Sequence, residues 1–82
     1  MKIIVKVFGR YKDVTEKDKV QLEITEGDTL WHVVDAFIKQ YPAVEKDKKF
    51  MMVSKNNMYV SYDTRITEKD EITLSPPVVS GG

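Results

Sequence analysis

Two glycines end the sequence, and they are the residues with the clearest chemical potential. Glycine makes up about 7% of residues in proteins, so a Gly-Gly ending arises by chance in about one protein in 200. Because Gly81 and Gly82 have no side chains, the carboxylate of Gly82 can enter a narrow channel in a partner enzyme. Attack of that carboxylate on the α-phosphate of ATP would give an acyl adenylate, from which a sulfur or nitrogen nucleophile can take the acyl group. The ending therefore predicts a carboxylate that another enzyme activates, and the alternative interpretation is a frayed tail.

The residues just before the glycines favour a tail that stands clear of the folded body. Pro76 and Pro77 end strand pairing, because proline has no N–H to donate. Residues 78–80 then separate the glycines from the last strand. We expect a folded domain over residues 1–75 and a flexible tail over residues 76–82.

The remainder of the chain offers few groups for catalysis or metal binding. The sequence has no cysteine and one histidine, which excludes disulfides, a cysteine nucleophile, thiolate metal sites and histidine-rich clusters. His32 lies near the start of an expected helix and off its apolar stripe, so we interpret it as a solvated surface residue. Acidic residues alternate with lysines, as is typical of solvated faces. We therefore predict no metal site.

Charge and hydropathy exclude two classes of partner. Thirteen Lys and Arg residues balance thirteen Asp and Glu residues, so the chain lacks the basic excess that nucleic-acid binders carry. No apolar run approaches the roughly 18 residues of a membrane span. The apolar residues near the N-terminus alternate with lysine, which indicates a strand and not a signal peptide. We expect a single cytoplasmic domain that binds neither nucleic acid nor membrane.

The chain alternates between strand and helix patterns. One stretch with the 3.6-residue period predicts a helix of about three turns that starts at Leu30 and ends before Pro42. The segment 10–19 is expected to be a long hairpin connection, and the segment 43–49 is expected to be a loop or at most a short turn. The expected strands cover residues 2–8, 20–25, 50–54, 58–62 and 71–75.

The order of these elements indicates the fold class. A hairpin, one helix and three further strands predict an α+β roll, in which a mixed sheet of about five strands carries one main helix across a single face. The strands from the two chain ends would lie side by side in the middle of that sheet. This arrangement matches a β-grasp fold.

A partner surface follows from the alternation in the first strand. If Ile3, Val5 and Val7 face the helix, then Ile4 and Phe8 lie on the other face of the sheet. Exposed apolar side chains there indicate a surface that a partner covers; the alternative for Phe8 is that the segment 10–19 covers it. The residues that we expect to bind a partner are Ile4, Phe8, Tyr59, Tyr62, Pro76, Pro77, Val78 and Val79.

Several motifs together resemble one known family over the whole chain. The most specific is the ending PPVVSGG, which is similar to a Pro-Pro-Val-x-Gly-Gly ending. The other motifs are residues 3–10 (IIVKVFGR), Gly27-Asp28-Thr29-Leu30, Gln40-Tyr41-Pro42, residues 53–60 (VSKNNMYV) and Lys69-Asp70-Glu71-Ile72. With these motifs the chain resembles the MoaD-type sulfur-carrier subunits of molybdopterin synthase, which are ubiquitin-like β-grasp proteins. It departs from them at Asn57 and Lys69, where the family prefers glycine, and its tail is one residue longer.

The resemblance implies a cycle of activation and sulfur transfer at Gly82. An E1-like enzyme, using ATP and magnesium, would adenylate the carboxylate, and a persulfide sulfur would replace AMP to leave a thiocarboxylate. The large subunit of molybdopterin synthase would receive the tail, supply the catalytic side chains and pass the sulfur to the pterin precursor of the molybdenum or tungsten cofactor. On this interpretation the chain is a carrier and not an enzyme, and it binds no cofactor itself.

Other final acceptors fit the same activation chemistry. In a ubiquitin-like protein modifier, the Gly82 acyl group would end on a substrate lysine. In a related carrier, the sulfur would go to tRNA or to thiamin. A plain binding module with an incidental Gly-Gly ending is the third interpretation.

Overall fold

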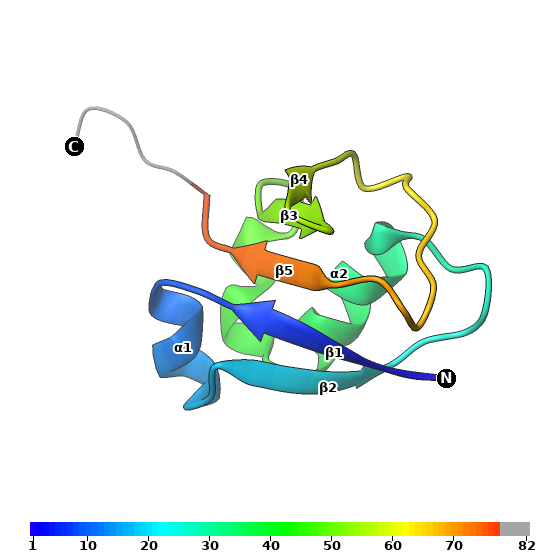
Figure 1. Ribbon diagram of the computed structural model, residues 1–82. Helices are drawn as coiled ribbons and strands as arrows, with labels where there is room; N and C mark the ends of the chain where they lie inside the picture. The colour runs from blue at the N-terminus through cyan, green and yellow to red at the C-terminus, as the bar shows by residue number, and fades with distance from the viewer. Residues whose placement is uncertain (78–82) are drawn as a thin grey trace.

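The computed structural model describes residues 1–77 of the 82-residue chain, so residues 78–82 of the predicted flexible tail lie outside the described residues. None of the helices in the described range has the length and apolarity needed to cross a membrane. In chain order the elements are β1 (Lys2–Val7), α1 (Arg10–Thr15), β2 (Lys19–Glu23), α2 (Leu30–Gln40), the 3₁₀ helix η1 (Pro42–Asp47), β3 (Met52–Lys55), β4 (Met58–Tyr59) and β5 (Ile72–Ser75), as Figure 1 shows.

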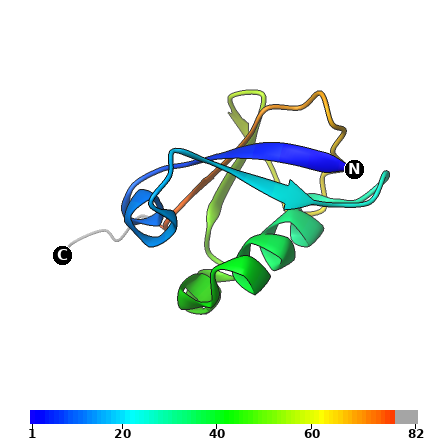
Figure 2. The same ribbon diagram turned by 90° about the horizontal axis from the view of Figure 1, so that it is seen from below.

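The strands form one mixed sheet in the order β2-β1-β5-β3-β4. β1 pairs in parallel with β5, and the other neighbours are antiparallel. The strands from the two chain ends therefore lie side by side at the centre of the sheet (Figure 1). α2 lies across one face of this sheet (Figure 2). The predicted α+β roll with a β-grasp arrangement is confirmed.

The core lies between that face of the sheet and one stripe of α2. The alternation predicted for the first strand is confirmed, because Ile3, Val5 and Val7 are buried while Ile4 is 54% exposed. Burial of each such side chain contributes roughly 1.5–3 kcal/mol. The remaining core positions on α2 and β5 are Leu30, Val33, Val34, Phe37, Ile72 and Leu74, all of them fully buried.

The segment 10–19, expected as a hairpin connection, contains the short helix α1. Tyr11 is buried and packs against Phe37 of α2, with 5.5 Å between ring centroids. Its hydroxyl donates a 2.8 Å hydrogen bond to Asp47, which also pairs with Arg10. Burial, and then the hydrogen bond to Asp47, raise the pKa of Tyr11 above its ordinary value. The expectation was wrong because a six-residue helix is too short to show a period, and tertiary contacts hold it in place.

Other element boundaries also differ from the prediction, most clearly after α2 and at the end of β4. The segment 43–49 was expected to be a loop or at most a short turn, but residues 42–47 form η1, in which Val44 is buried. β4 ends at Tyr59 instead of residue 62, because the chain there leaves the sheet to cap α2. The N–H groups of Leu30 and Trp31, which have no partner inside their own helix, donate to the carbonyls of Thr64 and Tyr62.

The start of α2 also explains the single histidine. His32 is exposed, as predicted, and its Nδ1 accepts a 3.0 Å hydrogen bond from the backbone N–H of Thr29. The Thr29 side chain in turn accepts from the backbone of His32, which completes a capping box. His32 therefore fixes the beginning of the helix, a role that its position off the apolar stripe did not reveal.

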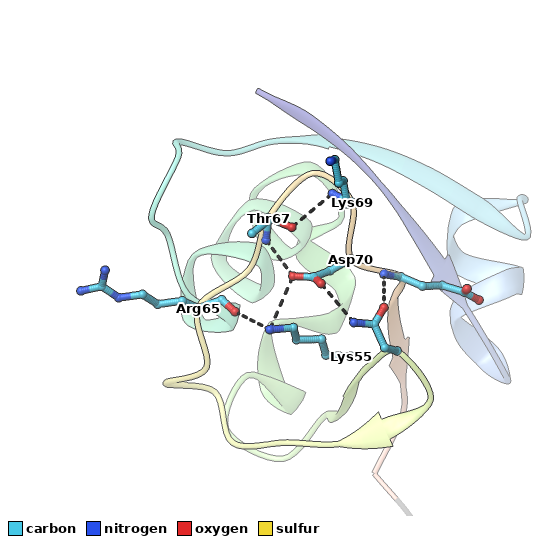
Figure 3. A network of polar contacts seen from close by, with 7 residues as sticks. Lys55, Arg65, Thr67, Lys69 and Asp70 are labelled. Carbon is cyan, nitrogen blue, oxygen red and sulfur yellow. Dashed lines mark hydrogen bonds and ion pairs between the residues drawn. The ribbon is translucent and has the colours of Figure 1, made fainter.

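The turn between β3 and β4 is joined to the segment that precedes β5 (Figure 3). Asn56 and Asn57 adopt left-handed conformations, with φ of 53° and 69°, which confirms the turn predicted from these residue types. The backbone N–H of Asn56 donates to the carbonyl of Glu71 at 2.8 Å. The N–H of Glu71 donates to Oδ1 of Asn56 at 2.9 Å. This reciprocal pair fixes the hairpin against the entrance to β5.

The carboxylate of Asp70 holds the same segment together. It accepts hydrogen bonds from the N–H of Thr67 at 2.8 Å and from Nδ2 of Asn56 at 3.1 Å. Lys55 Nζ lies 3.6 Å from it. Partial burial opposes ionisation of Asp70, but these donors outweigh it, so the pKa of Asp70 lies below its ordinary value.

We predict that Asp70→Ala destabilises the fold by about 1–3 kcal/mol at neutral pH, because it leaves several donors without their acceptor. The lowered pKa means that the Asp70 contribution is present above pH ~4 and is lost as the pH falls through the folded-state pKa. The free energy of unfolding, measured with urea, should therefore differ less between wild type and Asp70→Ala as the pH falls from about 5 to 2. A difference that stays constant over this range would contradict the assignment.

Candidate functional site

The tail starts from the centre of the sheet. β5 lies between β1 and β3, and it ends at Ser75, directly before Pro76 and Pro77. Four of the residues predicted to act in catalysis or binding lie outside the described residues: Val78, Val79, Gly81 and Gly82. The described part of the site is therefore the surface from which the tail departs.

Gly9 sets the course of the chain beside Pro76. Its φ is +60° with ψ of −141°, a conformation that residues with a side chain rarely adopt. A Cβ atom at Gly9 would lie 3.2 Å from Cγ and 3.3 Å from Cδ of Pro76, which is a crowded contact. The absence of a side chain thus lets the first proline of the tail pack against the end of β1. The sequence showed Gly9 only as a strand breaker.

The face of the sheet opposite α2 carries a shallow hollow of about 420 Å³. Phe8 and Tyr59, predicted to bind a partner, both line it and are 46% and 72% exposed. Ile4 is exposed further along β1, on the same side of the strand as Lys6. The residues that line the hollow are Lys6, Phe8, Met52, Ser54, Asn57, Tyr59, Glu71, Thr73 and Ser75. We call this surface the open face.

Tyr62 does not join the open face. Its ring packs edge-on against Trp31 of α2, with 4.4 Å between centroids, and its hydroxyl donates a 2.9 Å hydrogen bond to the carbonyl of Met51. Burial raises the pKa of Tyr62 above its ordinary value. The structure therefore brings Tyr59 and not Tyr62 to the hollow, although both had been expected to bind a partner.

An ion pair lies within the hollow. Lys6 Nζ is 2.7 Å from Oε1 of Glu71, and the two side chains are 41% and 50% exposed. The hydrogen bond from Lys6, and then its charge, hold the pKa of Glu71 below its ordinary value. Sequence reasoning did not single out this pair, because residues 65 positions apart meet only through the parallel pairing of β1 and β5.

The open face has the chemistry of a binding surface. Aromatic and thioether groups from Phe8, Tyr59 and Met52 border hydroxyl groups of Ser54 and Thr73. Such a mixture of apolar and polar groups is usual in protein interfaces. Among residues 1–77 no group of three or more histidine or acidic side chains is placed to hold a metal ion.

Comparison with known sequences gives a family and two related proteins. Residues 5–82 match the ThiS family. The molybdopterin synthase sulfur carrier subunit of Arabidopsis thaliana is 24% identical, over all of this chain and 84% of that protein. The protein of the same name from Dictyostelium discoideum is 28% identical, over 93% of this chain and 91% of its own length.

Solved structures share the fold at 20–24% sequence identity. Small archaeal modifier protein 1 from Haloferax volcanii superimposes with a TM-score of 0.81 at 24% identity, and the match covers 100% of both chains. A putative molybdopterin converting factor subunit 1 from Pyrococcus furiosus superimposes with a TM-score of 0.82 at 22% sequence identity, and the match covers 95% of this chain and 99% of the other.

One similar structure is a complex. In the complex of subunits 1 and 2 of the Helicobacter pylori molybdopterin-converting factor, the similar chain gives a TM-score of 0.64 at 20% identity and covers 99% of this chain and 100% of its own. The resemblance to MoaD-type proteins is confirmed by the names of the relatives and by the shared fold. Because the family match spans nearly the whole sequence, the chain belongs to the ThiS family of ubiquitin-like β-grasp proteins.

Proposed function

We propose that this chain is a sulfur carrier and serves as the small subunit of molybdopterin synthase. The observation that carries the proposal is the match to relatives named molybdopterin synthase sulfur carrier subunit, one of which spans the whole chain including Gly82. The placement of Pro76 and Pro77 directly after the central strand supports it, since the tail then starts beside the open face.

The chemistry proceeds at the Gly82 carboxylate. A carboxylate oxygen attacks the α-phosphorus of ATP on an E1-like enzyme, and pyrophosphate leaves. A persulfide sulfur then attacks the acyl carbon and expels AMP, and a thiol that cleaves the resulting S–S bond leaves the thiocarboxylate. The chain itself contributes the acyl group and the surface that positions it, while ATP and magnesium belong to the activating enzyme.

The open face is the surface on which we place the partners. Ile4, Phe8 and Tyr59 are exposed apolar side chains on or beside the hollow, and the tail begins at Pro76. A partner that covers this surface removes those side chains from water and receives the tail in the same encounter. The E1-like enzyme and the synthase large subunit, which would supply the catalytic side chains, are the two proteins expected to bind there in turn.

A second function, protein modification, fits the same fold. The similar Haloferax protein is named a small archaeal modifier protein, and in a modifier the ε-amine of a substrate lysine would attack the Gly82 acyl group. Sulfur delivery to tRNA or thiamin differs from the main proposal only in the final acceptor. The acceptor therefore separates these functions, and the activation step is common to them.

One prediction from this proposal concerns the terminal group. Incubation with ATP, magnesium, a persulfide donor and the E1-like enzyme of the same genome should raise the intact mass by about 16 Da, because sulfur replaces one carboxylate oxygen. Fragmentation should place the change at Gly82. A parallel reaction without ATP is the control, and an unchanged mass with an enzyme that activates its own known substrate would contradict the proposal.

The acceptor can be identified after activation. Non-covalent capture of a synthase large subunit, with sulfur transfer to the pterin precursor, would support the molybdopterin function. Isopeptide conjugates between Gly82 and lysines of other proteins would instead support the modifier function.

Another prediction from this proposal concerns the open face. Phe8→Asp should weaken binding to the synthase large subunit by at least about tenfold, because it buries a carboxylate where an aromatic anchor is expected. Phe50→Asp is the matched control: Phe50 is 67% exposed and does not line the hollow. Titration calorimetry measures both. Equal affinities of Phe8→Asp and wild type would exclude Phe8 from the interface.

A further inference from the structure

Two lysines face each other across neighbouring strands of the open face. In the antiparallel register of β1 and β2, Lys6 lies directly opposite Lys19. Residues paired in this way point to the same side of a sheet. The residues next to them in the strands are buried on the α2 side: Val5, Val7 and Val20. Because successive side chains of a strand point to opposite faces, both lysines project from the open face.

Only one carboxylate is paired with these two cations. Glu71 Oε1 lies 2.7 Å from Lys6 Nζ, and Lys19 forms no ion pair with any residue in the range 1–77. Both lysines nevertheless act on Glu71: the hydrogen bond and charge of Lys6, and to a smaller extent the charge of Lys19, lower its pKa. The cluster of Lys6, Lys19 and Glu71 therefore has an excess of one positive charge.

Stability does not explain this arrangement. Like charges directly opposite each other in a sheet destabilise the strand pair, and a half-exposed ion pair such as Lys6 with Glu71 contributes little. Lys6 and Glu71 also line the hollow between Phe8 and Tyr59. A protein that fills the hollow with an apolar side chain would cover the unbalanced positive charge at the same time.

We infer that the activating enzyme, when it docks on the open face, presents a carboxylate side chain to Lys6 and Lys19, beside the apolar group that fills the hollow. This inference rests on the proposed function, in which the open face receives the activating enzyme. An acidic side chain there gives each cation of the cluster an anion and compensates for the loss of water around them. A nucleic acid does not fit this cluster, because the carboxylate of Glu71 would repel the closely spaced phosphates of its backbone.

The test measures how the activating enzyme responds to single charges. The probe is the E1-like enzyme of the same genome, and the assay is ATP–pyrophosphate exchange as a function of the concentration of the full-length chain. Lys19→Gln should raise KM about fivefold, the effect of one exposed charge pair. It should leave kcat unchanged, because residues 76–82 are intact. Lys39→Gln removes the same charge from the exposed end of α2 and should match wild type.

A second variant removes the carboxylate of the same cluster and should not raise KM. Glu71→Gln removes the carboxylate that competes with the partner for Lys6, so KM should fall or stay unchanged. If the cluster served only the fold, both Lys19→Gln and Glu71→Gln would weaken activation. The KM of wild type should also rise with salt more steeply than that of Lys19→Gln, because salt screens the pair that the variant lacks.

The outcomes separate this inference from the proposed function. If wild type supports exchange and Lys19→Gln has the same KM as wild type, the acidic-partner inference is wrong and the carrier function stands. An equal rise in KM for Lys39→Gln would also overturn it, since net charge alone would then explain the effect. A fall in the urea midpoint of Lys19→Gln that parallels the rise in KM would assign the loss to folding. If wild type supports no exchange with an active enzyme, the proposed function fails and the inference fails with it.

Discussion

The parallel pairing of β1 with β5 determines where the functional parts of this protein lie. A parallel pair cannot be closed by a tight turn, so the rest of the chain forms the crossover between the two strands. The Phe8 N–H donates to the carbonyl of Leu74 at 3.2 Å, which joins the end of β1 to the end of β5. Phe8, whose ring is partly exposed, and the strand that leads into the tail are thereby held together. Gly9 completes this junction, because its missing side chain leaves room for Pro76.

The two faces of the sheet have separate tasks. The face toward α2 is filled by aliphatic side chains and accounts for the stability of the domain. The open face carries an aromatic hollow and the Lys6–Glu71 pair, which add little to stability and are suited to a partner. In the proposed function, the chemistry takes place at Gly82, beyond the described residues. If that proposal holds, substitutions on the open face and changes to the terminus can be made independently of each other.

Much of this arrangement was predictable from local pattern. The period-two alternation of β1 identified both its buried residues and the exposed Ile4 and Phe8, and the apolar stripe from Leu30 identified α2. Helix α1 was not predictable, because its six residues depend on the contact of Tyr11 with Asp47, 36 positions away. Tyr59 and Tyr62 could not be distinguished, since their exposure depends on where the chain leaves the sheet to cap α2. The Lys6–Glu71 pair likewise required the strand register.

In the proposed function, the folded body presents a terminal carboxylate that another enzyme activates. A decisive measurement is ATP–pyrophosphate exchange with the E1-like enzyme of the same genome, in which the full chain is compared with a chain that ends at Ser80. We predict that the shortened chain loses exchange completely while its urea unfolding curve is unchanged, because the core residues found within residues 1–77 all precede Ser75. Exchange that persists without Gly81 and Gly82 would contradict the claim and would place the function of this domain on the open face alone.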